Sequence, residues 1–180
     1  MDMEQIAASL ERVASLLRRK PQAGLADDSA ATARWDGGLR TSVRADKSGH
    51  TVFSVATDMP TELGGEASAM SPGWLLRAGL ASCSATRIAM AAAAAGIALR
   101  TLEVRATSRS DARGMLDIPD LDGAAVPAGP LAMALHVRIS APGVPDAHLR
   151  ALVASTWTCS PVTDTIGRPV PVALHVDVVA

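Results

Sequence analysis

The chain has 180 residues, of which 48% are hydrophobic and 19% charged, a composition typical of one globular domain with or without a small appendage. Its formal net charge is -1 at pH 7, which excludes the strongly basic character of many nucleic-acid-binding proteins. The acidic amphipathic start does not resemble a signal peptide, and charges interrupt the most apolar stretch. We therefore expect a cytoplasmic protein with no nucleic-acid partner and no membrane partner.

The first predicted element is an amphipathic helix over residues 4–19. Its apolar side chains recur with helical spacing, at Ile6, Leu10, Val13, Leu16 and Leu17. Pro21 ends this pattern, and mainly small and polar residues follow. We accordingly divide the chain into an N-terminal helix and linker, residues 1–32, and a main domain, residues 33–180. The helix is expected to dock on its own core or on that of a partner.

The main domain opens with alternating apolar and polar residues, which predict short strands over 39–45 and 51–57 joined by a turn at 46–49. Residues 58–71 contain Pro and Gly and are predicted to form a loop, in which Gly64 and Gly65 make a tight turn. Its acidic residues, Asp58, Glu62 and Glu66, are expected to face solvent, and the alternative is that one of them accepts a hydrogen bond from an arginine.

A long helix is predicted from Pro72 to about Ala95. Ser71 has the residue type of an N-cap, Pro72 suits the first helical position, and Gly96 suits the position just after the C-terminus. This helix is apolar on nearly all sides, which indicates that it is buried at the centre of the fold.

The rest of the chain is predicted to alternate strands with a second helix. Strands are expected at 99–109, 113–118, 131–141 and 170–179, with a helix at 145–159 that Pro161 ends. Runs of strands around two central helices favour an α+β fold over an alternating α/β fold.

The chain has two cysteines, Cys83 within the predicted central helix and Cys159 at the end of the second. Arg87 lies four residues after Cys83 on the same helical face and favours its thiolate, whereas a helix C-terminus disfavours the thiolate of Cys159. Cys83 is thus predicted to be the better nucleophile and Cys159 the better resolving thiol. The alternative is that both are inert small hydrophobic residues.

No cofactor or metal is expected from the sequence. The four histidines, at positions 50, 136, 148 and 175, lack the spacing of metal ligands. Metalloprotease, phosphate-binding-loop and dinucleotide-binding motifs are also absent from the sequence.

Several short motifs of the main domain resemble those of one bacterial family. In chain order they are Trp35-Asp36-Gly37-Gly38, Asp58-Met59-Pro60, Leu63-Gly64-Gly65, Ser71-Pro72, the helix segment from Leu75 to Cys83, and Cys159-Ser160-Pro161-Val162. Together they resemble the OsmC/Ohr family, the osmotically inducible and organic hydroperoxide resistance proteins. The resemblance spans about residues 33–179 and leaves the first helix outside.

This resemblance implies two central helices flanked by antiparallel sheets, and an intertwined homodimer with sites at the subunit interface. It also implies thiol-dependent reduction of organic hydroperoxides, in which the cysteine matching Cys83 is oxidised and the one matching Cys159 resolves it as a disulfide. An external dithiol then regenerates the pair. Family members hold the thiolate and the peroxide with an Arg from an early strand, for which Arg40 is the nearest match and Arg44 the second.

The chain departs from the family pattern at the start of the central helix. Peroxidase members carry a Glu directly after the helix-opening Pro, where this chain has Gly73. Without that carboxylate the Arg lacks the partner that orients it. Glu62 or Glu66 is the candidate to take over this role. A second function therefore stays open, a non-peroxidatic dimer that binds a small apolar or thiol-bearing ligand in its interface pocket. A structural or interaction role for the first helix is the third.

Overall fold

The computed structural model of the chain describes residues 3–45 and 53–179. In chain order its elements are α1 (Met3–Arg19), η1 (Pro21–Gly24), β1 (Ala31–Gly37), β2 (Arg40–Ala45), β3 (Phe53–Thr57), η2 (Thr61–Leu63), α2 (Pro72–Ala94), β4 (Thr101–Arg109), α3 (Ala112–Met115), β5 (Ala132–Ser140), α4 (Asp146–Thr156), η3 (Trp157–Cys159) and α5 (Pro161–Gly167). The predicted turn at 46–49 and His50 lie outside the described residues.

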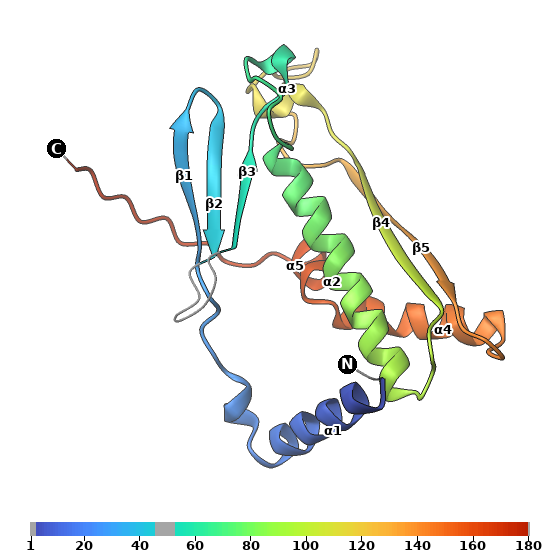
Figure 1. The fold of residues 1–180 in the computed structure, drawn as a ribbon. Coiled ribbons are helices and arrows are strands. Elements are labelled where there is room, and N and C mark those ends of the chain that lie inside the picture. Colours follow the sequence, from blue (N-terminus) through green and yellow to red (C-terminus); the bar gives the residue numbers. More distant parts are fainter. Residues whose placement is uncertain (1–2, 46–52, 180) are drawn as a thin grey trace.

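Two antiparallel sheets stand on either side of α2 (Figure 1). One has the strand order β1-β2-β3, with Thr41 opposite Thr57, and the other pairs β4 with β5. On β4 and β5 exposed residues alternate with partly buried ones, as expected for strands with one face against a helix. The predicted α+β fold with antiparallel sheets is thus confirmed.

The central helix begins and ends where its sequence predicts. Pro72 occupies the first helical position after an extended Ser71, and Gly96 takes the left-handed conformation after the helix C-terminus, with a φ of 66°. The buried side chains at Leu80, Ser84 and Ile88 recur every fourth residue and form one stripe on the helix. This stripe continues into the main core.

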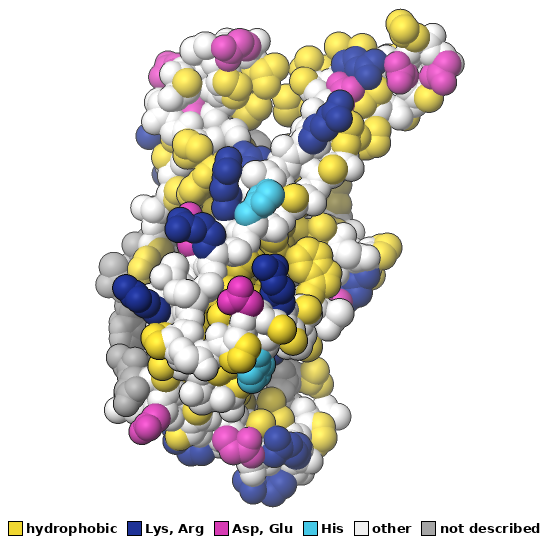
Figure 2. Space-filling model, turned by 90° about the vertical axis from the view of Figure 1, so that its right-hand side faces the viewer, with side chains coloured by type: hydrophobic (Ala, Val, Ile, Leu, Met, Phe, Trp, Pro, Cys, Tyr) yellow, Lys and Arg dark blue, Asp and Glu magenta, His cyan; other side chains and the backbone are white. Residues whose placement is uncertain are grey.

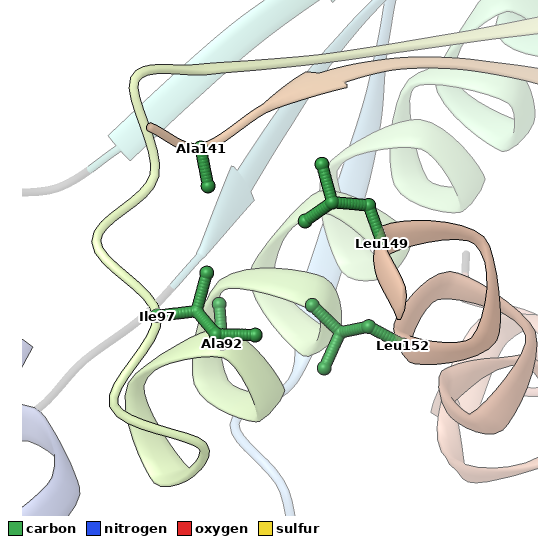
Figure 3. Close-up of a cluster of buried hydrophobic side chains, with 5 residues drawn as sticks. All are labelled: Ala92, Ile97, Ala141, Leu149 and Leu152. Atoms are coloured by element: carbon green, nitrogen blue, oxygen red, sulfur yellow. The ribbon is translucent and has the colours of Figure 1, made fainter. Parts of the chain in front are cut away.

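The core lies where the end of α2 meets α4 and the chain around β4 and β5. Figure 3 shows its buried side chains converging from these segments; they belong to Ala92, Ile97, Ala141, Leu149 and Leu152. The two alanines project no further than Cβ, so α4 and the end of β5 approach the helix closely. An aliphatic core was expected, since aromatic residues make up only 2% of the chain.

Helix α1 packs across the C-terminal end of α2 (Figure 1), and its Met3 contacts the core. The helix therefore docks on its own chain, the first of the two possibilities that the sequence left open. Val13 and Leu16 stay exposed even so. The division of the chain at residues 32 and 33 remains a prediction, while β1 begins at Ala31 within the predicted linker.

Two predictions about the middle and end of the chain are wrong. Residues 113–118 were predicted as a strand, but α3 forms there because the Asp111 side chain accepts a hydrogen bond from the backbone N–H of Arg113, at 3.0 Å. The segment after α5, predicted as a strand over 170–179, runs extended without strand pairing among the described residues. A strand requires a neighbouring strand edge, which this stretch does not meet within its own chain.

The second predicted helix is interrupted. Residues 145–159 were predicted as one helix that Pro161 ends, yet α4 ends at Thr156 and the tighter turn η3 carries the chain to Cys159. Pro161 instead opens α5, because a proline is well tolerated at the first helical position, where no intrahelical N–H bond is lost.

The face of the molecule that Figure 2 shows carries charges of both signs. On the face shown in Figure 2, Lys and Arg side chains are interspersed with acidic ones and form no single basic patch. Among the described residues, no helix combines the length and the apolar character needed to cross a membrane.

Candidate active site

The two cysteines occupy different environments, and both are free thiols. Cys83 lies in the middle of α2 and is half-buried, whereas Cys159 ends η3 and is exposed. Ser160 joins these two places: its hydroxyl donates a hydrogen bond to Cys83 Sγ, at 3.4 Å, and its side chain is only 1% exposed. The residue next to Cys159 in the chain thus contacts the Cys83 sulfur directly.

Buried hydroxyl groups without a partner lie close to this contact. Among the described residues, Ser84 Oγ and Thr163 Oγ1 are buried and accept or donate no hydrogen bond. Ser84 follows Cys83 on α2, and Thr163 lies in the first turn of α5. An unpaired buried hydroxyl carries a desolvation cost, so these groups are available to a ligand or a water molecule.

Each hydroxyl lines a largely apolar cavity. The larger cavity, of about 500 Å³, lies between α2, β5 and α5, and its walls include Leu76, Leu80, Leu135, Trp157 and Thr163. The smaller, of about 180 Å³, is lined by residues that include Ser84, Ile88, Val137 and Ser160. Trp157 and Leu135 contribute to both, so the two cavities are neighbours, and the smaller one reaches Ser160 of the Ser160–Cys83 contact.

Arg87 was predicted to share a helical face with Cys83 and to favour its thiolate. The residue is half-buried and lines a broad groove of about 910 Å³ between α1 and α2, together with Glu11 and Met90. Its influence on the Cys83 thiol therefore remains a prediction.

Arg40 and Arg44 lie on the same strand but differ in their surroundings. Arg40 begins β2, is half-buried, and its Nη1 donates a hydrogen bond to Ser68 Oγ at 2.5 Å. Arg44 is exposed. Within one chain the hydrogen bond of Arg40 thus goes to the loop that leads into α2 rather than to a cysteine.

That loop is organised around Asp58, for which the prediction of solvent exposure is wrong. The side chain is 2% exposed and accepts hydrogen bonds from the backbone N–H groups of Met59, Glu66 and Ser68, at 2.8, 3.3 and 3.0 Å. The Ser68 hydroxyl donates a further bond to Asp58, at 2.8 Å. The bonds from the N–H and hydroxyl of Ser68 are the main causes that hold the pKa of Asp58 below its ordinary value.

The expectation of solvent exposure holds for the other two acids of the loop, Glu62 and Glu66. The Glu62 carboxylate accepts a long hydrogen bond, 3.4 Å, from the neighbouring Thr61, and Glu66 contributes its backbone N–H to Asp58. Neither is the partner that the structure gives Arg40. The sequence signal for Asp58 was its place before Pro60 and the two glycines, a setting that favours a tight turn closed by an acidic side chain.

No metal centre is found in the described parts of the chain, where no three His, Cys, Asp or Glu side chains come together. The contact that the structure shows at a cysteine is the one between Ser160 and Cys83, while Arg40 is held by Ser68 of the loop before α2.

Known proteins share the fold of this chain, as a family model and several solved structures show. The family model described as OsmC-like protein matches residues 65–175, more than half of the chain. No curated protein matches. Among solved structures, an organic hydroperoxide resistance protein from Legionella pneumophila is 22% identical, with a TM-score of 0.56, and the alignment covers 79% of this chain and 90% of that one.

Two further solved structures have the same fold. An OsmC-like protein from Mycoplasma pneumoniae is 19% identical, with a TM-score of 0.59 and coverage of 79% of this chain and 89% of the other. An organic hydroperoxide resistance protein from Elizabethkingia anophelis is 22% identical, with a TM-score of 0.51 and the same coverage of the two chains, 79% and 89%. At these identities the likeness concerns the fold alone.

Proposed function

The chain belongs to the OsmC-like protein family, and from this premise we propose that it is a thiol-dependent peroxidase that reduces organic hydroperoxides with Cys83 and Cys159. The observation that carries the proposal is the contact between Ser160 and Cys83, because it brings the chain beside Cys159 to the sulfur of Cys83. Cys83 is half-buried, and Ser84 and Ser160 beside it line the smaller apolar cavity, which suits attack on a hydrophobic peroxide. The exposed Cys159 suits exchange with an external reductant.

In the first half of the cycle, the Cys83 thiolate attacks the distal oxygen of the hydroperoxide. The S–O bond forms, the O–O bond breaks, and the alkoxide leaves and takes up a proton to give an alcohol. Cys83 becomes a sulfenic acid, oxidised by two electrons, while the peroxide is reduced by two. The Ser160 hydroxyl stabilises the thiolate, because a hydrogen bond donated to the charged form favours that form.

In the second half, the Cys159 thiolate attacks the oxidised Cys83 sulfur. The S–S bond forms, and the sulfenic oxygen leaves as hydroxide and is protonated to water. An external dithiol then exchanges with the disulfide, so that both protein thiols return and the dithiol leaves as its own disulfide. We assign to Arg40 the role of holding the thiolate and the peroxide oxygen, since a guanidinium presents fixed N–H donors to an anion.

We further propose that the protein is an intertwined homodimer. The segment after α5 exposes an alternating series of apolar side chains, and Val172 and Leu174 are 91% and 86% exposed. Such a segment, extended and without strand pairing in its own chain, is suited to pair with a sheet edge of a second copy. We expect light scattering to give the mass of a dimer, and Leu174→Asp to shift the protein towards monomer.

The peroxidase proposal is tested by titrating free thiols before and after one equivalent of cumene hydroperoxide. We expect the native protein to lose both thiols and dithiothreitol to restore them. Cys83→Ser should keep the Cys159 thiol under the same treatment, and Cys159→Ser should stop at the sulfenic acid of Cys83. Retention of both thiols in the native protein, with reaction only after denaturation, would contradict the proposal.

The second candidate is a non-peroxidatic dimer that binds a small apolar or thiol-bearing ligand. The cavity of about 500 Å³ with its unpaired Thr163 hydroxyl favours it, because the size suits a small ligand and a buried hydroxyl would gain a partner on binding. Under this function, an apolar thiol such as octanethiol should raise Tm in the native protein, and Leu80→Trp should abolish the shift by filling the cavity. The same thiol titration then separates this candidate from the peroxidase.

A further inference from the structure

We propose that Asp58 and Ser68 are positioning residues that orient Arg40, and that they replace the carboxylate missing at Gly73. The inference rests on the proposed peroxidase function, in which Arg40 holds the peroxide. The guanidinium has five N–H donors, and the long Arg side chain that carries it has many rotamers. An Arg at the start of a strand with no hydrogen-bond partner would therefore spend much of its time away from the reacting atoms. A fixed acceptor close to its stem removes that freedom.

The hydrogen bonds between these residues run in one direction. Arg40 Nη1 donates to Ser68 Oγ at 2.5 Å, and Ser68 Oγ donates to Asp58 Oδ2 at 2.8 Å. A hydroxyl has a single hydrogen, and Arg is only a donor, so the proton of Ser68 must point to Asp58 and its lone pairs to Arg40. The negative charge of Asp58 polarises the hydroxyl and strengthens it as an acceptor for the guanidinium.

Asp58 is itself immobilised, so it can hold Ser68, and through it Arg40, in a fixed position. Three backbone N–H groups of its own loop bond to its carboxylate, and the side chain is almost fully buried. The backbone N–H of Asp58 also donates to the carbonyl of Met70, at 3.2 Å, just before α2. Arg40 is therefore tied to the start of the helix that carries Cys83.

The family position for the orienting carboxylate is occupied by Gly73, which has no side chain that could accept a hydrogen bond from Arg40. The other loop acids, Glu62 and Glu66, are exposed and bond elsewhere. Among the acidic side chains of this described loop, Asp58 is the one whose hydrogen bonds lead to Arg40, and it does so through Ser68.

The experiment measures the second-order rate constant for thiol oxidation by cumene hydroperoxide in Ser68→Ala. This variant keeps the backbone N–H that binds Asp58 but removes the hydroxyl between Asp58 and Arg40. We expect a loss of about 10- to 100-fold, the range of a hydrogen bond to a charged group. Ser68→Thr should restore most of the rate, and Thr61→Ala, which removes an exposed hydroxyl of the same loop, should leave it unchanged.

The Arg40→Ala background distinguishes a positioning role of Ser68 from a merely structural one, because a structural role would slow the oxidation with or without Arg40. If Ser68 acts through Arg40, adding Ser68→Ala to Arg40→Ala should cause no further loss of rate. An equal loss in both backgrounds, or a wild-type rate in Ser68→Ala, overturns the inference while leaving the peroxidase function standing.

A second measurement decides the inference if the native protein does not oxidise its thiols, which would reject the proposed function. Modification by phenylglyoxal is followed by mass spectrometry at Arg40, with the exposed Arg44 of the same strand as internal control. Ser68→Ala should speed modification of Arg40 several-fold relative to Arg44. An unchanged ratio means that Ser68 does not hold Arg40, and overturns the inference.

Discussion

Gly65 is the position where adding one methyl group should disturb the loop before α2 most. A Cβ at this residue would lie 2.0 Å from the Met59 carbonyl oxygen, whereas ordinary contact begins at 3.4 Å, so the backbone must move by about 1.4 Å. The Glu66 N–H to Asp58 bond is already 3.3 Å long and cannot survive such a shift. We expect Gly65→Ala to lower the free energy of unfolding by about 1–3 kcal/mol, the usual cost of overpacking.

Thermal unfolding and the thiol-oxidation rate measure the two consequences. A loss of about 1–3 kcal/mol corresponds to a decrease in Tm of roughly 2–12 °C for a chain of this size, and displacement of Asp58 should slow the oxidation by hydroperoxide. Gly64→Ala is the matched control, since Gly64 has a φ of 85° but open space around it. It should lose stability through backbone strain alone, about 1–2 kcal/mol, and keep its rate. Equal rates in the two variants would refute this reasoning.

Three further changes test other parts of the structure. Ile88→Ala, at a side chain 2% exposed, should cost about 2–5 kcal/mol in chemical denaturation, and a smaller loss would mean that the α2 core is loosely packed. Asp58→Asn should lower Tm at pH 7, but the difference from wild type should shrink as the pH falls below 3.8, because the lowered pKa of Asp58 stabilises the fold only while its carboxylate is ionised. Glu62→Gln, in the same loop, should show no such convergence. Gly73→Glu should raise Tm by roughly 1–4 °C through helix propensity and the helix dipole. The oxidation rate should change by less than about threefold, the effect expected of a weak ion pair. The reason is that Arg77 Nη1 lies 3.7 Å from the new Cβ and competes with Arg40 for the carboxylate.

The sequence by itself was enough to predict the elements whose signals are local. The apolar spacing of α1, the Ser71-Pro72 start and Gly96 end of α2, and the alternation of β4 and β5 depend on residues a few positions apart. The same holds for the α+β class, which follows from the order of such elements. The central position of Cys83 was likewise predictable, because it lies inside a helix that is apolar on nearly all sides.

Only the tertiary structure decided which of these elements meet. Asp58 was expected in solvent, but the loop folds back so that backbone N–H groups surround it, and burial then depends on residues up to ten positions away. The contact of Ser160 with Cys83 joins residues far apart in the chain and is set by how α5 packs on α2. The wrong prediction of a strand at 170–179 has the same physical origin. A strand is stabilised by a neighbouring strand, and alternation in a sequence does not say where that neighbour is.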